Sequence, residues 1–417
     1  MSLMKQIKKV LGGELRQYTM VFALVALIVI FNIASGGRMV TSSNFQNLIT
    51  GYSYVLVLAI GMLMVVVIGQ IDLSVGSAAA FCSMSMALLM REFSLPWWVG
   101  MLIGLAIGAA IGAWHGFWLA KVGIPGFITT LGGMMIFRGG VIWISKSISI
   151  PVPKEFTFFG AGHLPAWGPE TGMSNLTLLL GGLAIVALVL QQLSKHKRME
   201  RLSEEKEELW PTLVRIVLIS AVLAYLTWLF ASGRPGTSFP VPGVILVILV
   251  LIYHTITQRT RFGRHIYAVG GNKSAAALSG VNVKKTYFLT MLNMSFLAAI
   301  AGIMFLGRST SAGPSDGTGW ELDAVASVFI GGAAVSGGIG TVLNTMVGGM
   351  VMVVLNSGLM LMGVGADKTQ VIKGLVLLAA VAFDVYNKQQ GRKSIIAHLF
   401  PGAGTDSQEG NSAKSDK

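Results

Sequence analysis

Cysteine and acidic residues are scarce in this chain of 417 residues. The one cysteine, Cys82, lies inside an apolar run, which excludes a disulfide framework and a cysteine-based metal site. Only 12% of the residues are charged, and 18 Asp and Glu residues face 31 Lys and Arg residues. The chain has no HExxH, CxxC or nucleophile-elbow motif and no Walker-type loop, and its six His residues are scattered. We therefore expect no catalytic residues, no metal site and no cofactor bound by this chain.

What the chain has instead is apolar sequence: 53% of its residues are hydrophobic and 52 are glycine. Repeated apolar runs of about 20 residues predict an all-α, polytopic membrane protein, and abundant glycine suits close helix packing in lipid. We expect about twelve transmembrane segments, some of them short or broken. The segment 322–336 either crosses the membrane or is instead re-entrant or broken. The candidate spans are residues 18–34, 48–69, 73–90, 97–120, 127–145, 176–193, 213–231, 244–256, 287–306, 322–336, 342–362 and 371–385.

The basic residues orient these spans. The first run is longer than a signal-peptide core and has no clear cleavage site, so we expect it to be retained. Placing both termini in the cytoplasm puts most Lys and Arg residues in cytoplasmic segments, as the positive-inside rule requires. The net charge of +13 is then explained by topology and gives no reason to expect nucleic-acid binding. We expect a transmembrane domain over residues 1–393, with a charged cytoplasmic loop at 194–211, and a disordered cytoplasmic tail at 394–417.

The loop at residues 259–285 is a second cytoplasmic segment, with six Lys or Arg residues and no Asp or Glu. Asn272 can cap a short helix, and Gly280 can end it. Such a helix between two spans is either a docking surface for a partner protein or part of an ordinary basic loop. The candidate docking residues are Gly271, Asn272, Ala275, Ala276, Ser279 and Gly280.

Polar residues within the membrane are few. Gln70, Asp72 and Ser74 lie between two apolar runs and have glycines on either side, which predicts a broken helix whose backbone faces protein or water. Asp72 has three candidate roles: proton relay, hydrogen-bond partner of a substrate, or helix N-cap, which the sequence favours. Arg138 lies deep in an apolar run and needs a partner or water, and Asp72 is one candidate.

Other candidates for the lining of a path are more dispersed. The sequence at residues 330–340 has the Gly and Ser spacing of residues 68–77, which indicates either an internal repeat or chance. The outer loop at residues 146–174 is a cover for a pore mouth, a partner site or a simple connector. Polar and aromatic side chains suited to a sugar are also typical of helix contacts and interfacial anchors. These are Trp114, His115, Trp143, Asn293, Asn344 and Asn356.

Four stretches, in this order, resemble the permease subunits of bacterial ATP-binding-cassette (ABC) importers for monosaccharides. They are IDLSVGS (71–77), GIPGFITTLGGMMIFRGG (123–140), GRHIYAVGGNKSAAALSGVNV (263–283) and the Gly-rich segment 330–340. The likeness covers most of the chain and is greatest to the xylose or multiple-sugar type. It implies a ten-span core like that of ribose permeases, with two extra spans around the loop 194–211. Ala277 departs from the pattern, because many relatives have a basic residue there.

The resemblance implies a transport subunit that is not itself an enzyme. It would form a homodimer in the bacterial inner membrane, receive a pentose or hexose from a periplasmic sugar-binding protein, and be driven by ATP and Mg²⁺ in a partner ABC ATPase. The helix after Asn272 would then be the coupling helix. An alternative is a proton-coupled secondary sugar transporter that uses Asp72 and Arg138. A passive channel is a third hypothesis, and it would respond to neither energy source.

Overall fold

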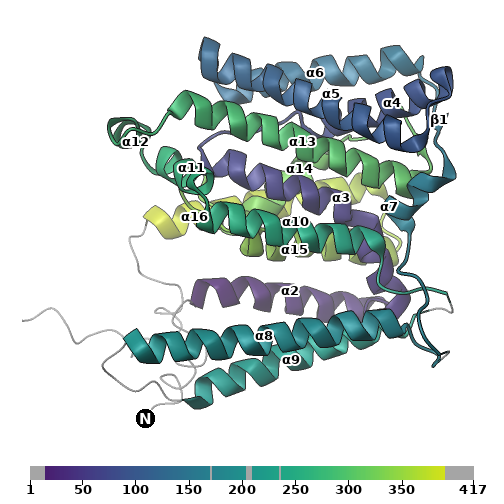
Figure 1. Cartoon of the computed structure of the whole chain (residues 1–417), viewed down its shortest axis with the longest axis vertical. Coiled ribbons are helices and arrows are strands. Elements are labelled where there is room, and N and C mark those ends of the chain that lie inside the picture. Colours follow the sequence, from purple (N-terminus) through teal and green to yellow (C-terminus); the bar gives the residue numbers. More distant parts are fainter. Residues whose placement is uncertain (1–14, 170, 203–208, 234–235, 390–417) are drawn as a thin grey trace, which may run out of the picture.

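The computed structural model describes residues 15–169, 171–202, 209–233 and 236–389, and these form a single bundle of helices (Figure 1). The predicted all-α architecture is confirmed. A pair of two-residue strands, β1 (Ile150–Pro151) and β2 (Ser311–Ala312), is antiparallel. The α-helices are α2 (Leu15–Ala34), α3 (Ser42–Val67), α4 (Val75–Phe93), α5 (Trp97–Phe117), α6 (Gly126–Ser145), α7 (Thr157–Ala161), α8 (Asn175–Leu202), α9 (Leu209–Ala231), α10 (Val241–Arg259), α11 (Arg261–Gly271), α12 (Lys273–Leu278), α13 (Val283–Ser309), α14 (Trp320–Ile330), α15 (Val342–Leu361) and α16 (Ala366–Gln389).

Eight helices in the described part of the chain are long and apolar enough to cross a membrane. Every predicted span coincides with a helix, but α14 has 11 residues and is about 16 Å long, against a hydrocarbon core of about 30 Å. Segment 322–336 is therefore a short helix followed by irregular chain, as expected if the segment is broken. The total of twelve crossings stays a prediction. Residues 203–208 of the charged loop, and the predicted tail 394–417, lie outside the described residues.

The long helices lie roughly side by side, so the bundle has two ends (Figure 1). We call the end with α11 and α12 the α12 face, and the end with β1 and α7 the β1 face. The predicted outer loop 146–174 contributes β1 and α7 to the β1 face, so this loop is folded against the bundle.

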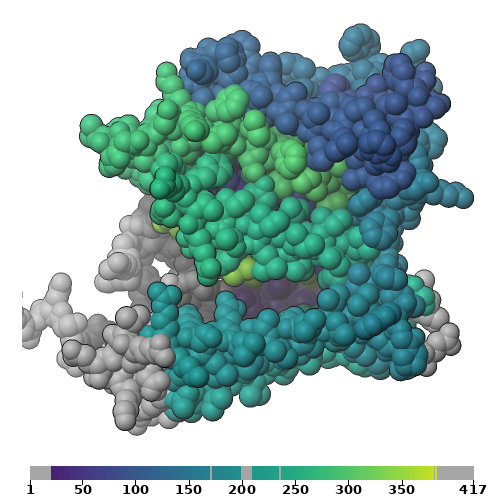
Figure 2. Space-filling model, in the orientation of Figure 1, coloured from purple at the N-terminus to yellow at the C-terminus, as the bar shows by residue number. Residues whose placement is uncertain are grey.

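Helices α8 and α9 pair at one edge and stand as a separate layer in Figure 2. Their attachment includes hydrogen bonds from Ser42 Oγ to the Leu229 carbonyl and from Gln46 Nε2 to the Phe230 carbonyl, the latter 3.1 Å long.

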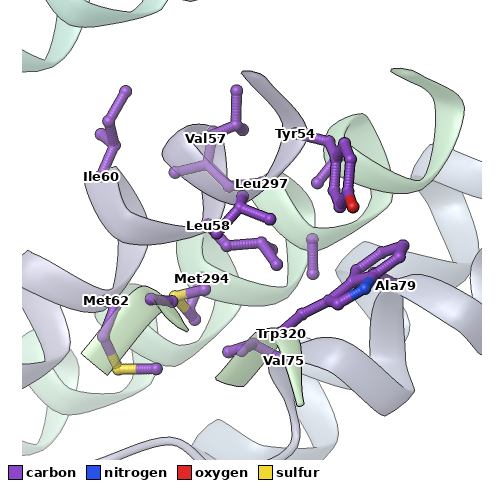
Figure 3. Packing of buried hydrophobic residues seen from close by; sticks show 14 of the residues in the cluster. Tyr54, Val57, Leu58, Ile60, Met62, Val75, Ala79, Met294, Leu297 and Trp320 are labelled. Carbon is purple, nitrogen blue, oxygen red and sulfur yellow. The ribbon is translucent and has the colours of Figure 1, made fainter. Parts of the chain in front are cut away.

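The interior is built around α3 and α13, which pack against each other, and these two with α15 are the most enclosed of the eight candidate spans. Figure 3 shows part of this core, where Leu58 of α3, Leu297 of α13 and Trp320 of α14 lie close together. Lipid tails are as apolar as leucine, so close van der Waals packing, more than release from water, holds these helices together. The fully buried Met62 and Met294 add unbranched side chains that fill irregular gaps.

Helix α5 has a glycine at every fourth position from Gly100 to Gly116. A methyl group on Gly108 would lie 2.6 Å from the Cβ of Ala299, and one on Gly112 would lie 2.5 Å from the Cα of Leu292. Glycine is therefore needed there for α5 to approach the backbone of α13. This row of small residues places α5 directly against α13.

Candidate functional site

The loop predicted to hold a short helix does so at the α12 face, where α12 projects from the bundle (Figure 1). Asn272 caps α12, because its Oδ1 accepts a hydrogen bond of 2.9 Å from the Ala275 N–H. After the helix, Gly280 has a φ of +84°, which ends the helix in a left-handed turn. Thr260 and Asn282 cap the two flanking helices in the same way. The sequence thus specifies three helix starts within about 25 residues, as local capping rules predict.

The surface of α12 differs in two ways from the predicted docking set. Gly271, Asn272, Ala275, Ser279 and Gly280 are exposed, as a docking surface requires, but Ala276 is only 5% exposed. Ala276 therefore packs inward, so it belongs to the support of the helix and not to its outer surface. The sequence set also omitted Leu278, which is 91% exposed. The signal was available, because residues three and four apart share a helix face and Leu278 follows Ser274 and Ala275 at those spacings.

Helix α11 joins α12 to the interior of the bundle. The Tyr267 hydroxyl donates a hydrogen bond of 2.7 Å to the Gly340 carbonyl, and burial raises the pKa of this phenol above its ordinary value. A methyl group on Gly270 would overlap the Val67 carbonyl at the end of α3. That carbonyl accepts a hydrogen bond of 2.8 Å from the Gly338 N–H. The irregular segment 331–341 is therefore held between α3 and α11.

The predicted break after α3 is present, because residues 68–74 are not helical. The freed backbone is satisfied by protein: the Leu73 N–H donates to Thr130 Oγ1 over 3.1 Å, and Gln70 Oε1 accepts from the Gly126 N–H over 2.8 Å. Asp72 Oδ1 accepts from the Ser74 N–H over 2.8 Å and from Ser74 Oγ over 2.6 Å. Ser74, not Asp72, is the N-cap residue of α4, and the Asp72 carboxylate fixes its position.

Asp72 has a further hydrogen-bond acceptor that this structural role does not use. Its side chain is fully buried, and its second oxygen, Oδ2, has no hydrogen-bond partner among the described residues. The nearby Ser77 hydroxyl and both ring nitrogens of His115 are likewise without partners there. Buried polar atoms of this kind are costly unless water or a solute reaches them. The neighbourhood of Asp72 is thus suited to a polar solute, although in the described residues no group of three or more His, Cys, Asp and Glu could hold a metal ion.

A second break meets the first inside the bundle. The segment between α13 and α14 places Gly317 against Gly76, where a methyl group on Gly76 would overlap the Gly317 carbonyl. The starts of α4 and α14 therefore approach each other, so two positive helix ends face one region. Arg138 does not pair with Asp72. Its Nη1 donates to the Asp316 carbonyl over 2.5 Å and thereby anchors the segment before α14.

The remaining candidates do not gather into one site. Asn293 accepts a hydrogen bond of 2.5 Å from the Tyr253 hydroxyl, as a contact between α13 and α10. Asn344 lies in the first turn of α15, near the α12 face, whereas Asn356 is buried further along α15. Trp143 is 82% exposed on α6, as an outer anchor would be. The other two aromatic candidates, Trp114 and His115, pack on Phe137.

A bundle of apolar spans, interrupted inside the membrane by two polar breaks and bearing a capped helix at one face, defines a multi-pass membrane permease. The chain belongs to the family described as branched-chain amino acid transport system / permease component, whose sequence profile matches residues 44–381. This confirms the predicted ABC permease class.

Individual relatives are similar over nearly the whole chain. The xylose transport system permease protein XylH of Haemophilus influenzae is 32% identical over 384 residues, covering 92% of this chain and 99% of that protein. XylH of Escherichia coli K12 is 32% identical over 90% of this chain and 93% of its own length. The ribose import permease protein RbsC of the same strain is 42% identical over 161 residues, which cover 39% of this chain and 49% of RbsC. No solved structure matches this chain.

Proposed function

We propose that this chain is the membrane-spanning subunit of an ABC importer that moves a monosaccharide, xylose or a related pentose or hexose, across the bacterial inner membrane. The observation that carries the proposal is the exposed tip of α12, where Leu278 presents an apolar side chain to water beside the capped Asn272 turn. Leaving a leucine in water forgoes about 1.5–3 kcal/mol of burial free energy, which docking would recover. The two xylose permeases, similar over almost their full lengths, support the choice of solute.

The partners follow from this role. Two copies of the chain form the pore, an ABC ATPase docks on α12, and a periplasmic sugar-binding protein docks on the β1 face. ATP and Mg²⁺ are used by the ATPase, and this chain binds no cofactor. Six Lys and Arg residues between Arg259 and Lys285 lie at the α12 face, which supports a cytoplasmic α12 face and cytoplasmic termini.

Coupling in this proposal is mechanical. Closure of the ATPase pair displaces α12, and α11 carries the displacement to the segment 331–341 through Tyr267 and Gly270. That segment connects α14 to α15, so the short helix α14 shifts against α4 at the contact of Gly76 and Gly317. The polar residues near this contact line the path. They are Gln70, Asp72, Ser74 and Arg138, with Asn293, Asn344 and Asn356 on neighbouring helices.

The test is the variant Leu278→Asp in the full chain, with Leu278→Met as a matched control that keeps the apolar contact. ATPase co-purification and ATP-driven uptake should both fall for Leu278→Asp. Losing a burial of about 1.5–3 kcal/mol corresponds to roughly a tenfold or greater loss of affinity. Leu278→Met should behave like the unmodified chain. Because Leu278 is almost fully exposed, neither variant should unfold the protein.

Equal ATPase binding by Leu278→Asp and the unmodified chain would refute docking at α12. Uptake of radiolabelled sugar by the purified chain alone, driven by a pH gradient and without an ATPase, would favour the proton-coupled transporter. Downhill flux that responds to neither energy source would favour the channel. A panel of D-xylose, D-ribose, D-glucose and D-galactose in the same vesicles identifies the solute.

A further inference from the structure

A cavity of about 450 Å³ lies between α3, α14, α15 and α16, beside the end of the second break, whose Thr318 and Gly319 contribute to its lining. Its volume is within the range of about 300–1,000 Å³ that is usual for small-molecule sites. It extends from Met360 and Ala366, at the β1 face, to Leu377 on α16. From Ala366 to Leu377 is 11 residues of helix, so the cavity is about 16 Å deep. A solute arriving from the β1 face would thus enter the membrane-embedded part of the protein here.

One wall of the cavity is aromatic. Tyr54 of α3 and Trp320 of α14, both labelled in Figure 3, line it. Their ring centroids are 4.5 Å apart. Phe305 packs edge-on against Trp320, with centroids 4.6 Å apart, and so fixes the orientation of the indole. Rings held in this way offer a rigid apolar surface, while the Tyr hydroxyl and the Trp N–H supply polar edges. This combination fits a solute with both C–H faces and hydroxyl groups.

Another part of the lining is polar and carries a partly buried ion pair between Asp323 and Lys373. Lys373 Nζ of α16 lies 2.9 Å from Asp323 Oδ1 and 3.0 Å from Oδ2, and Asn356 lines the cavity with them. Thr369 and Gln370 precede Lys373 by four and three residues, so they share its face of α16 and line the cavity with it. A carboxylate can accept about four hydrogen bonds and an ammonium can donate three. The pair therefore has acceptors and donors left for a neutral, hydroxyl-rich solute.

We infer that this cavity binds the ring of a monosaccharide during its passage, and this inference rests on the proposed function. The charges of Asp323 and Lys373 cancel, so the site favours an uncharged solute over an ion. Hydrogen bonds from charged groups to hydroxyls are stronger than those between neutral groups. Trp320 is also the first residue of α14, three residues beyond the contact of Gly317 with Gly76. Movement of α14 during transport would alter this wall of the cavity and release the sugar toward the break at α4.

The single cysteine provides a direct test. Cys82 is fully buried, so the full chain has no accessible thiol in its described part, and one introduced cysteine can be labelled alone. Thr369→Cys places a near-isosteric thiol in the cavity, and Ser149→Cys places an exposed thiol elsewhere on the β1 face. The measurement is the rate of modification by a water-soluble methanethiosulfonate reagent, with and without the sugar that the uptake panel identifies.

The sugar should slow labelling of Thr369→Cys about threefold at twice its Kd, because protection scales as one plus the ratio of ligand to Kd. Ser149→Cys should be labelled at the same rate with and without sugar. Adding Asn356→Leu to Thr369→Cys should abolish the protection. Equal labelling rates for Thr369→Cys, in a preparation that still performs ATP-driven uptake, would overturn the cavity site and leave the proposed function standing. Loss of uptake of every sugar by the unmodified chain with its partners would overturn both.

Discussion

The hydroxyl of Tyr267 in α11 donates a hydrogen bond to the carbonyl oxygen of Gly340, 73 residues further along the chain and just before α15. This bond joins the segment that carries α12 to the irregular chain between α14 and α15. Near it, the Gly338 N–H bonds the Val67 carbonyl at the end of α3. Three parts of the bundle thus meet at the α12 face, directly behind the proposed docking helix.

Tyr267→Phe should weaken coupling without preventing docking. The change removes one hydrogen bond, which contributes about 0.5–1.5 kcal/mol net. We expect ATP-driven uptake to fall severalfold while ATPase co-purification stays unchanged, as measured in reconstituted vesicles. Tyr225→Phe, on the exposed part of α9, is the control and should have no effect. Unchanged uptake by Tyr267→Phe would show that this bond carries no part of the coupling.

Gly270→Ala and Gly271→Ala form a matched pair at the end of α11. A methyl group at Gly270 would overlap the Val67 carbonyl, whereas one at Gly271 would meet no atom within 4 Å. Overpacking of this kind costs about 1–3 kcal/mol. Gly270→Ala should therefore lower the midpoint of thermal unfolding in detergent and reduce uptake, and Gly271→Ala should leave the midpoint near its original value. The contact with α3 would be unimportant if the two variants behaved alike.

Substitutions at Asp72 separate its structural role from a role of its charge. Asp72→Ala removes the acceptor for the Ser74 N–H and hydroxyl, so α4 should lose about 1–3 kcal/mol of stabilisation and uptake should fall. Asp72→Asn keeps an oxygen acceptor and should retain most of the uptake. Glu92→Ala, at an exposed carboxylate, is the control. If Asp72→Asn were as inactive as Asp72→Ala, the negative charge itself would be required, as the proton-coupled alternative demands.

Arg138→Met should destabilise the approach to α14. The substitution leaves the Asp316 carbonyl without the Nη1 donor that lies 2.5 Å away, at an expected cost of about 1–3 kcal/mol. Thermal unfolding followed by tryptophan fluorescence should show a lower midpoint than that of the unmodified chain. Trp143→Met, on the same helix but 82% exposed, should shift the midpoint little. A midpoint unchanged by Arg138→Met would mean that another group holds the segment.

Much of the fold was predictable because lipid imposes simple rules. Apolar length locates the helices, Asn272 and Gly280 mark the limits of α12, and Gln70 with Asp72 marks the break, since each signal is local in the sequence. Ala276 was included in the predicted docking set but is buried, because the sequence does not show which side of a short helix packs on the bundle. Leu278 was omitted although its spacing from Ala275 placed it on the same helix face.

The polar contacts between distant segments were not predictable. Asp323 and Lys373 are separated by 50 residues. In the sequence, Lys373 is therefore recognised only as a charged residue at the edge of a span. The charge of Arg138 suggested a carboxylate partner, Asp72. Its hydrogen-bond partner is instead the backbone carbonyl of Asp316. Such pairings depend on how α14 and α16 lie across the bundle, which apolar periodicity does not encode. The cavity could therefore be recognised only once these helices were placed.

The glycine row of α5 has a mechanical consequence. Helix α13 starts at Val283, five residues after α12 ends, and runs unbroken to Ser309, where Gly307 touches Gly160 of α7 at the opposite face. Because Gly108, Gly112 and Gly116 seat α5 directly on its backbone, α13 is braced along much of its length. The two closely packed helices therefore form a rigid pair, and α13 is not interrupted between its two ends. A displacement of α12 would thus be transmitted by the rigid helix α13 to the β1 face. This route is separate from the one through the flexible, glycine-rich segment 331–341 beside Tyr267.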